Sequence, residues 1–107
     1  MGFHKHTFPI RMIDAAEKPI EIVTGWANKD YTIGFHKICT RRKSWEKWAA
    51  TDLYTGTYLT IQKTRRECVE WIENNQKIIA EKMAEPFYTQ RVMEFKKLLE
   101  AEMEEME

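Results

Sequence analysis

Residues 43–71 read KSWEKWAATDLYTGTYLTIQKTRRECVEW, and this stretch decides the fold. Apolar residues at alternating positions are typical of two half-buried strands. The alternating residues are Trp48, Ala50, Leu59 and Ile61. Between them, Thr55-Gly56 supplies a glycine that can adopt a positive φ, which a short hairpin loop often needs. The stretch therefore predicts a β-hairpin whose turn lies at residues 52–56.

A helix is predicted directly after this hairpin. Thr64-Arg65-Arg66-Glu67 has the spacing of a capping box, in which the threonine hydroxyl accepts a hydrogen bond from the backbone N–H three residues on. The residues that follow recur at steps of three and four, which places them on one helical face. These residues are Cys68, Trp71, Ile72, Asn75, Ile79 and Met83. We predict a first helix over residues 64–84 that packs on the sheet.

Three more strands are predicted before the hairpin, over residues 7–13, 20–26 and 31–39, the last bound being approximate. Pro9 has no backbone N–H to donate, so the first strand is expected at an edge of the sheet. The chain then reads as one domain of the α+β class over residues 1–107. Residues 1–63 form a mainly antiparallel sheet of about five strands, and two C-terminal helices follow.

The second of these helices is predicted over residues 86–106. Pro86 cannot continue the first helix and suits the opening turn of another. Apolar residues in this segment alternate at steps of four and three, close to the seam of a coiled coil. We predict that this stripe forms the interface of a homo-oligomer, through Tyr88, Val92, Phe95, Leu99 and Met103.

Composition excludes some classes of protein. Hydrophobic residues make up 43% of the 107 residues, which is too many for a disordered chain. No apolar run is long enough to span a membrane, and the N-terminal residues lack the layout of a signal peptide. Two cysteines without a secretory signal indicate reduced thiols in the cytoplasm.

The net charge is zero, but the charges are unevenly placed along the chain. Residues 36–66 contain eight lysines and arginines against two acidic residues, a net charge of +6. Residues 94–107 contain six glutamates against two lysines, a net charge of −4. This uneven distribution, with a basic middle and an acidic end, is the feature of the sequence that points most clearly to a function.

Signatures of catalysis and metal binding are weak. His4 and His6 would share one face of a strand, and His36 or Cys39 could complete a metal site, but no Cys-x-x-Cys accompanies them. We interpret the histidines as surface residues and predict no metal and no cofactor. Cys68 could be a nucleophile activated by the helix dipole, but its place in the apolar stripe favours core packing. The glycines form neither a P-loop nor a dinucleotide fingerprint, so we predict that the protein is not an enzyme.

Basic and aromatic residues around the hairpin form the strongest candidate site. Guanidinium groups pair with phosphate, and aromatic rings stack on bases. The basic loops 41–43 and 65–66 should meet at one end of the sheet, since one precedes the hairpin and the other follows it. The candidate ligand-binding residues are Arg41, Arg42, Lys43, Trp45, Lys47, Tyr54, Tyr58, Arg65 and Arg66. A protein partner or a merely solvated face would explain the same residues.

The predicted order of strand, strand, strand and helix over residues 31–84 resembles the arm-type DNA-binding domains of phage integrases. In those domains a Trp-containing strand, a Gly turn and a Thr-initiated helix occur in this order. The corresponding residues here are Trp48, Gly56, Thr64, Glu67 and Trp71. The resemblance is one of shape and implies binding to DNA without implying membership of the family.

The functional hypothesis is a small non-enzymatic binding protein of phage or mobile-element type. It would engage a nucleic acid or a nucleotide-like anion through the basic and aromatic residues. The alternative hypothesis is a protein inhibitor or adaptor, for example an anti-defence protein, that acts by direct contact with a partner protein. The dependence of binding on salt separates the two, because binding to nucleic acid weakens steeply as salt rises.

Overall fold

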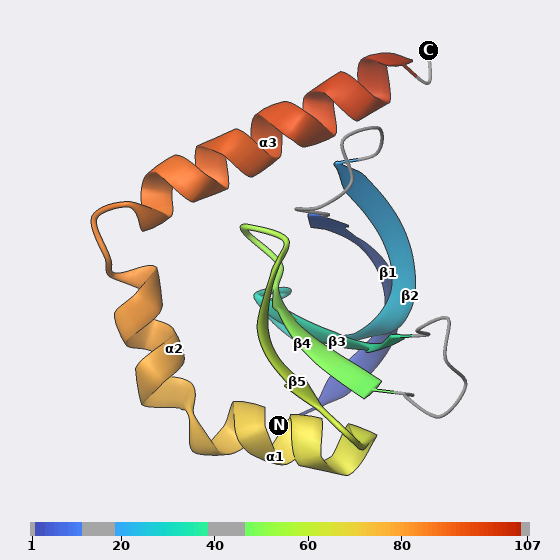
Figure 1. Cartoon of the computed structure of the whole chain (residues 1–107), viewed down its shortest axis with the longest axis vertical. Helices are drawn as coiled ribbons and strands as arrows, with labels where there is room; N and C mark the ends of the chain where they lie inside the picture. The colour runs from blue at the N-terminus through green and yellow to red at the C-terminus, as the bar shows by residue number, and fades with distance from the viewer. Residues whose placement is uncertain (1, 12–18, 39–46, 106–107) are drawn as a thin grey trace.

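The computed structural model describes residues 2–11, 19–38 and 47–105. A five-stranded sheet comes first in the chain, and helices follow it (Figure 1). The elements in chain order are β1 (Phe3–Arg11), β2 (Ile20–Asn28), β3 (Ile33–Ile38), β4 (Lys47–Asp52), β5 (Thr57–Gln62), α1 (Arg65–Asn74), α2 (Gln76–Met83) and α3 (Tyr88–Glu105). This order confirms the predicted α+β class.

The strands pair in chain order, and each is antiparallel to the next. The longest pairing joins β1 to β2, from Phe3 opposite Asn28 to Arg11 opposite Ile20. β1 therefore begins at Phe3 and not at residue 7, because the whole of β2 offers it hydrogen-bonding partners. As predicted, Pro9 lies in an edge strand, where a missing N–H is tolerated.

The helix predicted over residues 64–84 is in fact two helices, α1 and α2. The chain leaves the helical conformation at Asn75, whose φ is −119° and ψ is 25°. There the side-chain amide of Asn75 donates to the carbonyl of Trp71 at 2.8 Å, and the amide of Gln76 donates to the carbonyl of Ile72 at 2.6 Å. Side-chain donors that satisfy these carbonyls give the backbone an alternative to a continued helix, which sequence periodicity does not show.

The first helix covers one face of the sheet, here called the outer face. Its start is as predicted, because the hydroxyl of Thr64 accepts from the backbone N–H of Glu67 at 3.1 Å. Cys68 and Ile72 are fully buried where α1 lies against β3, β4 and β5. The other buried members of this core are Ile33, Phe35, Ala50 and Ile79.

The opposite face, here called the inner face, has a smaller core of its own. Its buried members are Phe8, Ile10, Ala27 and Leu53. Figure 1 shows β1 and β2 curving strongly away from the plane of the other strands. The curl lets the inner face bury apolar side chains although no helix lies flat upon it.

The curl is fixed where the end of β1 meets the tip of the β4–β5 hairpin. The backbone N–H of Arg11 donates to the carbonyl of Gly56 at 2.8 Å. Gly56 has a φ of 70°, the left-handed conformation that was expected of this turn. The ring of Phe95, only 2% exposed, lies against Gly56 and brings α3 to the same point. Strand, hairpin and helix therefore meet at one glycine.

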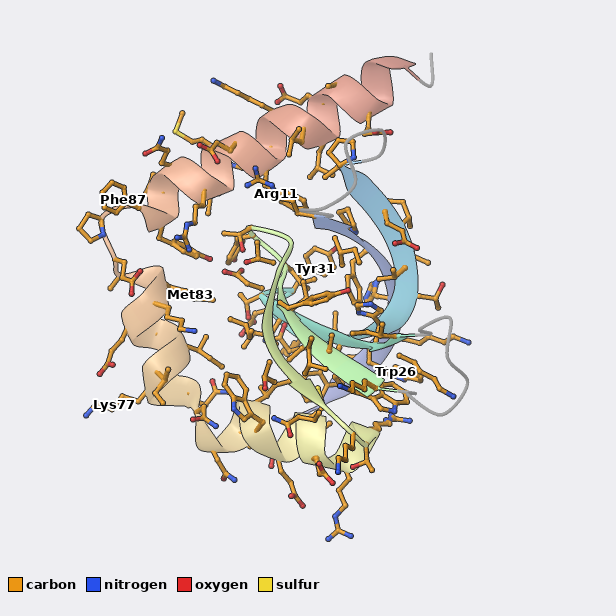
Figure 2. The ribbon with its side chains drawn as sticks, viewed as in Figure 1. Arg11, Trp26, Tyr31, Lys77, Met83 and Phe87 are labelled. Carbon is orange, nitrogen blue, oxygen red and sulfur yellow. The ribbon has the colours of Figure 1, made fainter. Side chains whose placement is uncertain are left out.

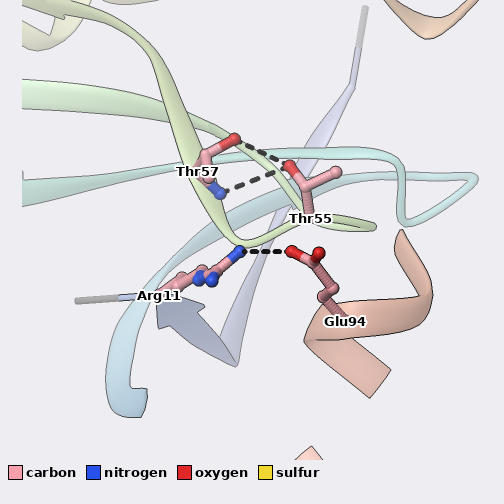
Figure 3. A network of polar contacts seen from close by, with 4 residues as sticks. All are labelled: Arg11, Thr55, Thr57 and Glu94. Carbon is pink, nitrogen blue, oxygen red and sulfur yellow. Dashed lines mark hydrogen bonds and ion pairs between the residues drawn. The ribbon is translucent and has the colours of Figure 1, made fainter. Parts of the chain in front are cut away.

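Polar contacts surround this meeting point (Figure 3). The guanidinium of Arg11 lies 3.5 Å from the carboxylate of Glu94 on α3. The hydroxyls of Thr55 and Thr57 are 2.7 Å apart and share a hydrogen bond across the hairpin turn. The ion pair is partly exposed, so it adds little to stability and serves mainly to orient α3.

We predict that Gly56→Ala destabilises the protein by about 1–3 kcal/mol. An added Cβ would lie 2.5 Å from the ring of Phe95 and 2.9 Å from the backbone nitrogen of Arg11, at a φ that alanine adopts poorly. Unfolding in urea measures the loss. Gly2→Ala is the matched control, because a Cβ there meets nothing within 4 Å. Equal stability of the two variants would contradict this description of the turn.

Candidate polyanion-binding surface

The structure describes only part of the two predicted basic segments. Arg41, Arg42, Lys43 and Trp45 lie outside the described residues. At the end of the sheet that leads to α1, Trp48 of β4 pairs with Gln62 of β5. The start of β4 and the end of β5 therefore lie side by side. The prediction that the two basic loops meet depends on this arrangement of the strands.

Arg65, in the first turn of α1, makes the clearest contact of the candidate residues. Its guanidinium carbon lies 4.3 Å from the centre of the Trp26 ring and 5.6 Å from that of Phe35. A guanidinium over an indole face is held by a cation–π attraction of about 0.5–2 kcal/mol. Arg65 is nevertheless an exposed residue.

Trp26 is a site residue that the sequence analysis missed. It lies on β2, far from Arg65 along the chain, and was interpreted only as the end of a strand. Its ring stacks on Phe35 with centroids 5.5 Å apart and an interplanar angle of 14°, and it contacts Trp48 at 5.9 Å. No local pattern marks such a residue, because the contact depends on the pairing of β2 with β3.

The register of the sheet adds two lysines on the same outer face. Lys5 of β1 is paired with Trp26, and Lys37 of β3 is paired with Trp48. Residues directly opposite in an antiparallel pair have side chains on one face, about 5 Å apart at Cβ. We call this set the Trp26–Arg65 surface: Lys5, Trp26, Lys37, Trp48 and Arg65.

The remaining predicted binding residues lie elsewhere. Arg66 is exposed and forms an ion pair with Glu70 at 3.1 Å, one turn along α1. Lys47 is half-buried at the start of β4. Tyr54 is in the hairpin turn, where its backbone N–H donates to Asp52 at 2.9 Å. Tyr58 is on the inner face, with its ring 5.8 Å from that of His36. Neither tyrosine joins the Trp26–Arg65 surface.

Charge at the start of α1 favours a bound anion. Arg65 and Arg66 both stand in the first turn, where the helix dipole is positive, and Glu67 is the acidic residue of that turn. A cation in that position costs about 0.3–1 kcal/mol at an exposed site. A negatively charged ligand bound there would instead interact favourably with both the arginines and the helix dipole.

The stripe predicted for self-association is partly used within the chain itself. Phe95 is buried against Gly56, while Val92 and Leu99 are half-buried. The hydroxyl of Tyr88 is enclosed, and burial raises its pKa strongly, with the nearby Asp52 carboxylate adding to the rise. The side chain of Met103 lies outside the described residues. Self-association through α3 remains a prediction.

The interpretation of the histidines as surface residues is confirmed for two of them and is wrong for His36. His4 and His6 are exposed on β1, but His36 is only 4% exposed, and burial lowers its pKa. Its burial follows from the curl of the sheet, which closes β1 and β5 over β3. Cys39 lies outside the described residues. Within residues 2–11, 19–38 and 47–105, no three His, Cys, Asp or Glu side chains gather as metal ligands would.

We predict that Cys68 is unreactive in the folded protein. Burial raises the pKa of its thiol to about 11, so at pH 8 the reactive thiolate is scarce. In a Cys39→Ser variant, which leaves Cys68 as the single thiol, iodoacetamide should react at least about 100-fold more slowly than with free cysteine. The same variant unfolded in urea is the control. Rapid reaction of the native protein would contradict the burial of this thiol.

Comparisons with known proteins assign no identity to the chain. No protein-family model, no curated protein and no solved structure matches it. Among the described residues, no helix is both long and apolar enough to cross a membrane. The likeness to integrase arm domains therefore stays a likeness in the order of elements, and function is argued from the surface itself.

Proposed function

We propose that the protein is a non-enzymatic binding protein that engages a nucleic acid or a nucleotide-like anion at the Trp26–Arg65 surface. The observation that carries the proposal is the guanidinium of Arg65 lying 4.3 Å over the ring of Trp26 while remaining exposed. One side of the guanidinium rests on the indole, and the exposure of Arg65 among the described residues leaves it accessible to a ligand.

Two kinds of contact are available at this place. A base can stack on the exposed side of the guanidinium, whose carbon lies 4.3 Å from the centre of the Trp26 ring and 5.6 Å from that of Phe35. The N–H groups at its edge can donate to a phosphate oxygen, with the positive end of α1 adding to the attraction. Lys5 lies beside Trp26 on the sheet and supplies a further cation.

Stacking of this kind favours unpaired bases over duplex. A base within a duplex presents only its edge in a groove, whereas an unpaired base offers its full face. We therefore propose single-stranded nucleic acid, or a free nucleotide, as the ligand. A role in the cytoplasm fits the two cysteines of the chain.

A protein partner is the second candidate, and it has its own observation. Phe87, between α2 and α3, is 69% exposed, and Met93 on α3 is 55% exposed. Figure 2 shows Phe87 at the corner between these helices, on the opposite side of the molecule from Trp26. Large apolar groups left in water are common at protein interfaces. An inhibitor or adaptor would use this corner, as would a second copy of the chain.

We predict that Arg65→Gln weakens binding of a fluorescent 20-nucleotide oligo-dT by about tenfold or more, equal to about 1.4 kcal/mol. The change removes the stacked cation and the phosphate donor while keeping a side chain of similar length. Fluorescence anisotropy at several salt concentrations measures the affinity. The slope of log affinity against log salt should fall by roughly 0.7 in magnitude for each phosphate that the variant no longer neutralises.

Lys77→Gln is the matched control, since Lys77 is an exposed cation on α2 away from Trp26 (Figure 2). It should bind as the parent does. The proposal fails if Arg65→Gln and Lys77→Gln bind equally well, or if the parent binds neither oligo-dT nor ATP at low salt. Unfolding in urea should show both variants folded.

A further inference from the structure

A cavity of about 440 Å³ lies on the inner face, on the other side of the sheet from the Trp26–Arg65 surface. Cavities of this size accommodate a small organic ligand. The strand register points six of the lining side chains to this face. The six residues are Ile10, Glu21, Val23, His36, Ile38 and Tyr58.

The curl of the sheet is what assembles this cavity. Tyr58 on β5 and Glu21 on β2 are separated by two strands in the sheet, yet both line it. Gly25 on β2 lets His36 come close, because a Cβ at Gly25 would lie 2.8 Å from the Cβ of His36. The lining is mixed: aliphatic side chains alternate with polar groups from three different strands, and these polar groups include Thr24 and Lys37.

His36 is the deepest polar residue of the cavity. It is only 4% exposed, and its Nδ1 is enclosed with no hydrogen-bond partner among the described residues. Burial lowers its pKa, so the ring is neutral and carries one proton. An enclosed N–H without an acceptor is rarer in proteins than an enclosed acceptor without a donor. The proton is therefore assigned to Nε2, which leaves that nitrogen as a donor.

Tyr58 and Glu21 both line the cavity, and both are exposed to solvent. The ring of Tyr58 lies 5.8 Å from that of His36 and continues its aromatic wall. Burial raises the pKa of Tyr58, and the carboxylate charge of Glu21 raises it further. The hydroxyl thus stays protonated, and the carboxylate offers an acceptor within reach of the same space. The Nε2–H donor of His36 and the carboxylate acceptor of Glu21 match a ring nitrogen beside an amino group.

We propose that this cavity binds an amino-substituted nitrogen heteroaromatic ring, held by His36, Glu21 and Tyr58. The ring nitrogen accepts from Nε2 of His36, and the amino group donates to the carboxylate of Glu21. Tyr58 contacts the face of the ring, and Ile10, Val23 and Ile38 cover its apolar atoms. The binding site and the Trp26–Arg65 surface lie on opposite faces of the sheet, although Lys37 belongs to that surface and also lines the cavity.

Titration of isotope-labelled protein with 2-aminopyrimidine, and separately with adenine, tests the proposal by NMR. Saturable shifts are expected at His36, Glu21 and Tyr58. Toluene and benzoate are the comparison probes, since one lacks polar groups and the other is an anion. Equal or stronger binding of either comparison probe would overturn the proposal, as would the absence of saturable binding of both amino heterocycles up to their solubility.

Variants separate recognition from simple filling of a cavity. Glu21→Gln, which removes the acceptor charge, and Tyr58→Leu, which removes the aromatic face, should each weaken 2-aminopyrimidine binding about tenfold, and their spectra should otherwise match that of the parent. Glu81→Gln, at an exposed acid on α2, should leave binding unchanged. Arg65→Gln should also bind as the parent does, which distinguishes this site from the proposed nucleic-acid surface. Unchanged affinity in Glu21→Gln and Tyr58→Leu would overturn the assigned contacts.

Discussion

The hydrogen bond between the N–H of Arg11 and the carbonyl of Gly56, 2.8 Å long, is the contact on which the rest of the structure depends. It ties the end of one edge strand to the hairpin that leads into the other. Gly56 allows this contact for two reasons. Its positive φ turns the chain, and its missing side chain leaves room for Phe95. The same point receives Phe95 of α3, so the closure of the sheet and the position of α3 are linked.

Closure gives the sheet two faces with different chemistry. The outer face joins Arg65 to Trp26, so an exposed cation stands where the dipole of α1 is positive. The inner face encloses His36 beside a cavity with a mixed aliphatic and polar lining. A flat sheet would leave His36 in water and part Glu21 from Tyr58. The ligand proposed for the outer face is charged and stacks, and the ligand proposed for the inner face is small and neutral.

Local patterns in the sequence predicted the elements whose causes are local. Thr64 begins α1 and Gly56 turns the hairpin, because each effect depends on a few neighbouring residues. The break at Asn75 escaped prediction because side-chain amides compete with the helix there, while the apolar spacing continues undisturbed. Periodicity indicates which residues share a helical face, but it does not indicate which backbone carbonyls accept hydrogen bonds from side chains.

The candidate site was predicted less well than the fold, for a physical reason. Arg65 was chosen for its charge, but its aromatic partner, Trp26, comes from a strand placed by pairing across the sheet. Tyr54 and Tyr58 are close to Arg65 in sequence, yet the register turns Tyr58 to the inner face. The burial of His36 likewise depends on the curl, and residue spacing alone does not indicate curvature.

The contact between Arg11 and Gly56 can be measured directly by NMR. A scalar coupling across the hydrogen bond, between the amide nitrogen of Arg11 and the carbonyl carbon of Gly56, reports that these two groups are bonded. We expect a measurable coupling and slow hydrogen exchange of the Arg11 amide. No coupling, together with exchange as fast as in an unfolded peptide, would show that the sheet is open and would contradict the closure described above.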